Sequence, residues 1–107
     1  MARLNLTADG DISTSQTVVT IDASSAAVEG NLPAADDAAG IKFNIIALDV
    51  TNEASLVTDD GSSIGTGLKY IFENEGEYIQ VESNGKNYII IGKGIRIPEV
   101  ADWTKLA

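Results

Sequence analysis

Apolar and polar residues alternate along most of the chain, in short runs that turn signals separate. This period of two is typical of half-buried strands, whose side chains point in turn to opposite faces. The runs are rich in β-branched residues, and ten glycines among the 107 residues favour turns between them. The pattern predicts an all-β domain of about eight short strands, either a small antiparallel β-sandwich or a closed barrel.

The predicted strands occupy the ranges 16–23, 26–31, 41–50, 54–58 and 68–72 and the two arms of a hairpin within 77–92. We expect a β-domain over residues 17–92. Residues 1–16 are polar and form an N-terminal arm or edge strand, and residues 93–107 form a C-terminal extension. Pro98 cannot continue a paired central strand, so the residues just before it belong to an edge strand or an exit.

Two of the strands have further expected features. The run 41–50 is expected to be central and buried on both faces towards its end. One face carries Ile41, Phe43, Ile45 and Ala47, and the other carries Ile46, Leu48 and Val50. In the run 68–72, the residues expected to share a face are Leu68, Tyr70 and Phe72.

One short helical segment is expected between residues 33 and 40. Pro33 suits the first turn of a helix, and the alanines and aspartates after it can make one or two turns. Gly40 fits the left-handed position that ends a helix. Leu32, just before this segment, is expected to fill one end of the core.

Asn84-Gly85 lies between two runs of β-forming residues and predicts a two-residue type I′ turn, in which both residues have positive φ. Ser83 then pairs with Lys86. One face of the hairpin carries the core residues Ile79, Val81, Tyr88 and Ile90. The opposite face is also mostly apolar and carries Tyr78, Gln80, Ile89 and Ile91. We therefore expect a second sheet or another copy of the chain to cover it.

The net charge of −9 is unevenly distributed, because residues 4–85 hold 14 acidic and 2 basic side chains. The other basic residues lie near the ends of the chain. This acidity argues against a nucleic-acid partner, which requires phosphate neutralisation by lysine and arginine. No apolar run approaches the roughly 20 residues that span a bilayer, and no secretory signal is recognisable at the N-terminus, which predicts a cytoplasmic site of synthesis.

The chain contains no cysteine and no histidine, which removes thiolate chemistry, the commonest general base and the commonest metal ligand. No enzyme activity, cofactor or metal is expected. The acidic turn 73–77 is interpreted as solvated. Asp9 and Asp11 lack the remaining ligands of a calcium loop and predict a plain turn. The glycine-rich loop 59–67 lacks the lysine and the following helix of a phosphate-binding loop, and Ile64 is expected to point inward from it.

Trp103 is the only tryptophan. It packs either on its own domain or on a neighbouring subunit, where tryptophan is a frequent anchor. The three tyrosines fall at strand positions expected to be in the core. This placement disfavours a carbohydrate-binding module, which needs exposed aromatic residues, but such a monomeric module remains an alternative.

Several motifs occur together in a fixed order. They are Thr17 to Asp22 (TVVTID), Leu32 to Ile45 (LPAADDAAGIKFNI), Gly61 to Gly65 (GSSIG) and Gly76 to Gly92 (GEYIQVESNGKNYIIIG). Over residues 17–92 this order resembles the small β-domain of tailed-bacteriophage virion accessory proteins, namely capsid decoration proteins, head fibres and tail fibres. One departure is that such hairpins often carry tryptophan just after the turn, where this chain has Asn87-Tyr88.

The resemblance implies a homotrimeric structural protein, with no catalytic role, on the capsid surface of a virion. The shortness of the chain favours a decoration, or cement, protein that binds the major capsid protein and stabilises the shell. The alternative is a host-binding head-fibre or tail-fibre module that recognises a surface glycan. The expected trimer interface comprises Tyr78, Ile89 and Ile91. The residues expected to dock on the capsid are Arg3, Lys93, Arg96, Trp103 and Lys105.

Overall fold

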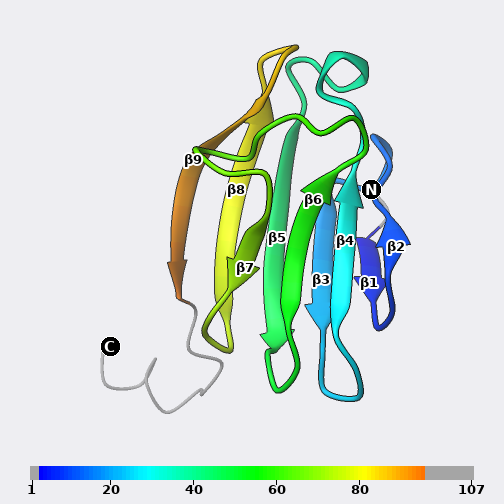
Figure 1. Cartoon of the computed structure of the whole chain (residues 1–107), viewed down its shortest axis with the longest axis vertical. Coiled ribbons are helices and arrows are strands. Elements are labelled where there is room, and N and C mark those ends of the chain that lie inside the picture. Colours follow the sequence, from blue (N-terminus) through cyan, green and yellow to red (C-terminus); the bar gives the residue numbers. More distant parts are fainter. Residues whose placement is uncertain (1–2, 96–107) are drawn as a thin grey trace.

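A computed structural model describes residues 3–95 of the chain (Figure 1). It is mostly β, with two mixed sheets and essentially no helix, so the all-β prediction is confirmed. The strands are β1 (Arg3–Leu6), β2 (Gly10–Asp11), β3 (Val18–Asp22), β4 (Val28–Leu32), β5 (Lys42–Asp49), β6 (Ala54–Thr58), β7 (Tyr70–Phe72), β8 (Glu77–Ser83) and β9 (Tyr88–Ile95). Among these residues, no helix is long and apolar enough to cross a membrane.

The first six strands alternate between the two sheets. Sheet A has the order β1-β3-β5-β8-β9, and sheet B has the order β2-β4-β6-β7. Consequently β1, β3 and β5 run parallel to one another, as do β2, β4 and β6. The prediction of an antiparallel fold is therefore wrong for these strands. Only the pairs β5–β8, β8–β9 and β6–β7 are antiparallel among the named strands of residues 3–95.

The loops explain why successive strands do not form hairpins. The loop after β3 crosses to the other sheet and stacks on the loop after β5. The Ala23 N–H donates to the Asp49 carbonyl at 3.0 Å, and the Asn52 N–H donates to the Ala23 carbonyl at 3.0 Å. Each strand of one sheet, together with the next strand of the other sheet, makes one winding of the chain. Parallel pairing follows because equivalent strands of successive windings lie side by side.

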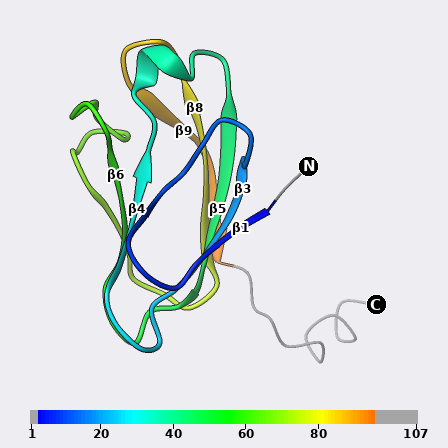
Figure 2. The same cartoon turned by 90° about the vertical axis from the view of Figure 1, so that its right-hand side faces the viewer.

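The core lies between the two sheets, which face each other in Figure 2. Alternate residues of each strand point into it, as the period of two predicts. The largest fully buried side chains are Tyr88, Phe43, Ile21, Leu32, Ile45, Leu56, Ile79, Val19, Val28 and Val81. The expected inward positions of Leu32 and Ile64 are confirmed. The central position of β5 in sheet A is confirmed as well.

Two expectations are wrong, namely the burial of Leu48 and the inclusion of Leu68 in a strand with Tyr70 and Phe72. Leu48 is 48% exposed, because no element of residues 3–95 covers the outer face of β5 at this end. Leu68 is 69% exposed, because β7 begins only at Tyr70 and Leu68 still belongs to the preceding loop. Tyr70 and Phe72 do share a side, and their rings meet edge to face with centroids 5.1 Å apart.

The β8–β9 hairpin forms, but its predicted register is wrong. Ser83 pairs with Tyr88, so the loop contains four residues. Gly85 has a φ of 93°, whereas Asn84 has negative φ, and a type I′ turn is therefore absent. Instead the Asn84 carboxamide oxygen accepts the N–H groups of Lys86 and Asn87, each at 2.9 Å. Between Ser83 and Val81 the register differs from the predicted one by two positions, which leaves Tyr88, Ile89 and Ile90 on their predicted faces. A bulge between Gln80 and Val81 then shifts the pairing by one more position, so that Gln80 pairs with Gly92 and Ile79 pairs with Lys93.

The predicted helical segment is a single 3₁₀ turn over Ala35–Asp37. Gly40 has a φ of 82°, the left-handed conformation that its position predicted. Ala35 and Ala38 point into the core, so this turn closes the end of the molecule above Leu32. The exposed aspartates of the turn face solvent.

Candidate interaction surface

The outer face of sheet A, which points away from sheet B, carries paired rows of side chains. In an antiparallel or parallel ladder, directly paired residues share a face. One row runs across all five strands through Arg3, Val18, Asn44, Gln80 and Gly92. The next row runs through Asn5, Thr20, Ile46, Tyr78 and Gly94. On the three central strands these rows combine Val18, Ile46 and Tyr78 with the polar residues Thr20, Asn44 and Gln80.

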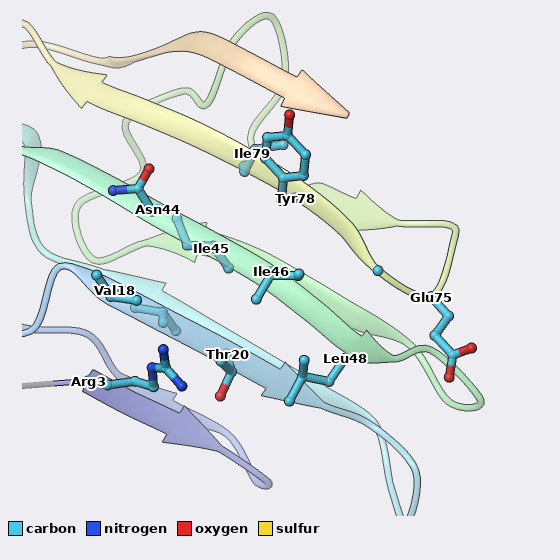
Figure 3. A pocket seen from close by; sticks show the side chains of 12 residues that line it. Arg3, Val18, Thr20, Asn44, Ile45, Ile46, Leu48, Glu75, Tyr78 and Ile79 are labelled. Carbon is cyan, nitrogen blue, oxygen red and sulfur yellow. The ribbon is translucent and has the colours of Figure 1, made fainter. Parts of the chain in front are cut away.

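A groove of about 530 Å³ lies along this face. Its lining on β3, β5 and β8 includes the apolar residues Val18, Ile46, Leu48 and Tyr78 and the polar residues Thr20 and Asn44. Figure 3 shows Arg3 near one end of the groove and Glu75 near the other. The groove thus combines a partly apolar floor with one charge of each sign at its ends.

Tyr78, Ile89 and Ile91 are exposed, with 41%, 47% and 44% of their surface accessible, so the expectation that Tyr78 lies in the core is wrong. Sheet B covers the core face of the hairpin, and among residues 3–95 no element covers these three side chains. The Tyr78 ring lies over β9. Its hydroxyl would be only 2.9 Å from a Cβ atom placed on Gly94. The trimer interface assigned to these residues stays a prediction.

The residues expected to dock on the capsid do not gather in the described part of the chain. Arg3 lies on β1 at one edge of sheet A, beside the groove. Lys93 lies on β9 at the other edge, where its ammonium group is 5.4 Å from the centre of the Tyr70 ring of sheet B. Arg96, Trp103 and Lys105 lie outside the described residues.

A carboxylate is buried where the sequence predicts a solvated acidic turn. Glu77 is only 7% exposed and accepts hydrogen bonds from the Tyr70 hydroxyl and from the N–H groups of Glu73 (2.8 Å) and Asn74 (3.1 Å). Burial acts to raise the pKa of Glu77, but these hydrogen bonds and the Lys93 charge outweigh it and lower the pKa. Burial and the hydrogen bond to Glu77 raise the pKa of Tyr70.

An acidic cleft lies on the outer face of sheet B, beside β2 and β4. The Asn31 amide donates to the carboxylates of Asp11 (3.1 Å) and Asp59 (3.2 Å), and Asp9 accepts the Glu29 N–H at 2.8 Å. The carboxylates are thus held by the chain itself. In residues 3–95 no group of three acidic side chains has a geometry that could hold a metal ion.

Two of the motifs that carry the family resemblance meet at one end of the molecule. The Tyr88 hydroxyl of the hairpin donates to the Pro33 carbonyl at 2.7 Å, and the Gly40 N–H donates to the Ser83 carbonyl at 2.8 Å. The Ser83 hydroxyl also donates to the Ala35 carbonyl. Burial, together with two nearby aspartates, raises the pKa of Tyr88 to about 12. The Leu-Pro segment and the hairpin are therefore one structural unit.

We expect Ser83→Ala to lower the free energy of unfolding by about 1–3 kcal/mol, because the buried Ala35 carbonyl loses its hydroxyl partner. Urea denaturation followed by far-UV circular dichroism measures this change. The matched control is Ser25→Ala, in an exposed loop, which should leave stability unchanged. Equal effects of the two substitutions would contradict the structural role of Ser83.

Comparison with known protein families, with curated proteins and with solved structures finds no match to this chain.

Proposed function

We propose that this chain is a capsid decoration protein of a tailed bacteriophage, which assembles as a homotrimer on the head and stabilises the shell. The observation that carries the proposal is the exposed apolar strip on β8 and β9, formed by Tyr78, Ile89 and Ile91. Exposed apolar surface of this kind marks a site of protein association. The order of motifs that resembles virion accessory proteins supplies the biological setting.

The distribution of charge favours association through sheet A. Its outer face carries Arg3 and Lys42, and the acidic Glu82 that pairs with Lys42, together with uncharged polar and apolar residues. The outer face of sheet B instead carries the acidic cleft formed by Asp9, Asp11, Glu29 and Asp59. Like charges repel, so two copies approach more readily through sheet A than through sheet B.

The edge strand β9 supports the same assignment. It has eight residues, whereas the other edge strands β1, β2 and β7 have four, two and three. A long edge strand presents unpaired backbone groups to another chain. In the proposed trimer, each subunit is a two-layer β-sandwich whose β9 edge faces the threefold axis. The basic residues near the termini then face the major capsid protein.

We expect light scattering to give the wild-type protein a mass three times the 11.2 kDa of one chain. The double variant Ile89→Lys/Ile91→Lys should have the mass of one chain and an unchanged circular dichroism spectrum. Three copies of two charges would have to enter an apolar interface, which is costly without partners. Ile71→Lys is the matched control, since Ile71 is equally exposed but lies on β7 of sheet B.

A wild-type monomer at micromolar concentration, or a trimer that survives the double substitution, would contradict this interface. The function itself is tested by adding the purified protein to capsids that lack it. We expect saturable binding and greater resistance of the capsids to heat. Binding to host-surface glycans, with no binding to capsids, would contradict the decoration function and support host recognition instead.

A further inference from the structure

The groove on the outer face of sheet A lies next to the point where the described chain ends. In the β8–β9 ladder, Gly94 pairs with Tyr78, and Ile95 pairs with Glu77. Tyr78 lines the groove, as do Glu75 and Gly76 in the turn before β8. The chain therefore leaves β9 beside the end of the groove that Glu75 marks.

Twelve residues follow Ile95, and every third one is apolar, namely Ile97, Val100, Trp103 and Leu106. An extended segment of this length reaches about 40 Å, at about 3.3 Å per residue. Five strands about 4.8 Å apart are only about 19 Å wide between the outer strands. Residues 96–107 are thus long enough to follow the whole groove.

The charges of this segment match the order of charges along the groove. In the sequence, Arg96 follows directly after Ile95, and Glu99, Asp102 and Lys105 come after it, whereas the groove has Glu75 at the end near Ile95 and Arg3 at the other end. Opposite charges at both ends favour one direction of binding. The apolar residues between them complement the floor of Val18, Ile46, Leu48 and Tyr78.

We propose that residues 96–107 bind in this groove on the same chain, with Trp103 as the anchoring side chain. A tryptophan supplies the largest apolar surface of any residue and needs such a groove to bury it. The groove shares Tyr78 with the proposed trimer interface, but Ile89 and Ile91 are absent from its lining, so substitutions of those two residues leave the groove intact. The proposal assigns Trp103 to the subunit itself and leaves Lys105 for the capsid.

Fluorescence tests the proposal directly, because Trp103 is the only tryptophan. We expect the full-length protein to show a blue-shifted emission maximum and weaker acrylamide quenching than the same protein in urea, at every protein concentration. Ile46→Glu places a charge on the groove floor and should shift the emission to the position seen in urea. Leu48→Glu, at a more exposed position of the same groove, should shift it in the same direction.

Two control variants distinguish this contact from a general effect of added charge and from a contact between copies. Ile71→Glu, on sheet B, should leave the emission unchanged. Ile89→Lys/Ile91→Lys should also leave it unchanged, even where it dissociates the trimer. The proposal is overturned if wild-type emission equals that in urea, if neither groove variant shifts it, or if the blue shift disappears on dilution or in the double variant. The last two results would place Trp103 on a neighbouring copy.

Discussion

Tyr88→Ala should lower the free energy of unfolding by about 3–5 kcal/mol, the range measured for the loss of a large aromatic side chain from a core. Tyr88 is 1% exposed and is the largest of the fully buried side chains. Its ring packs edge to face on Phe43 with centroids 6.0 Å apart, and its hydroxyl donates to the Pro33 carbonyl at 2.7 Å. The substitution therefore opens a cavity and frees the Leu-Pro segment from the hairpin.

Two further tyrosine variants separate the contribution of the hydroxyl group from that of the buried ring. Tyr88→Phe keeps the ring and removes only the hydrogen bond, so it should cost about 1–2 kcal/mol. Tyr78→Ala removes the same side chain from an exposed position on the same hairpin and should cost about 1 kcal/mol or less. Denaturation midpoints in urea measure all three variants. A cost for Tyr78→Ala equal to that for Tyr88→Ala would show that the two faces of the hairpin are misassigned.

Glu77→Leu should lower the free energy of unfolding by about 2–4 kcal/mol, because it leaves the Tyr70 hydroxyl and two backbone N–H groups without their acceptor. Glu77→Gln preserves the shape and should cost less. Glu75→Gln is the matched control in the same turn, where the side chain is exposed and should contribute little. Urea denaturation at pH 7 compares the three.

The pH dependence gives Glu77 a second signature. Its pKa is lower in the folded than in the unfolded protein, so its contribution to stability is complete above its ordinary value of about 4.3 and disappears as the pH falls through the lowered value. The wild-type protein should therefore lose more stability than Glu77→Gln between pH 5 and the acid range. Parallel pH profiles of the two proteins would show that folding does not lower the pKa of Glu77.

The positions of the strands can be predicted from the sequence, but their partners cannot. Alternation reports which face each side chain takes, and it correctly places Phe43 and Ile45 inward and Ile89 outward. It carries no information about whether the next strand returns beside the last one or crosses to the other sheet. Short loops such as 23–27 permit both, so the parallel order of β1, β3 and β5 does not follow from the pattern.

The candidate surface can be predicted in part. Alternation identifies the hairpin residues Tyr78, Ile89 and Ile91, but the groove joins Tyr78 to Val18 and Leu48, which only strand order brings together. The burial of Glu77 contradicts the prediction of a solvated turn, although the signal is present. Glu77 has the same parity as Ile79 and Val81, so alternation itself places it on the core face. The prediction of a solvated side chain follows the general rule for acidic turns and disregards the alternation.

The winding of the chain between the two sheets has a consequence for how insertions in the sequence can change the width of the sheets. Each winding pairs only with the windings before and after it, and loops of unequal length connect them. Stacked units that contact only their neighbours have roughly additive stabilities. A whole winding can therefore be inserted before β3 without altering the β8–β9 hairpin. The distance between the β1 edge and the β9 edge is thus an adjustable dimension of the molecule.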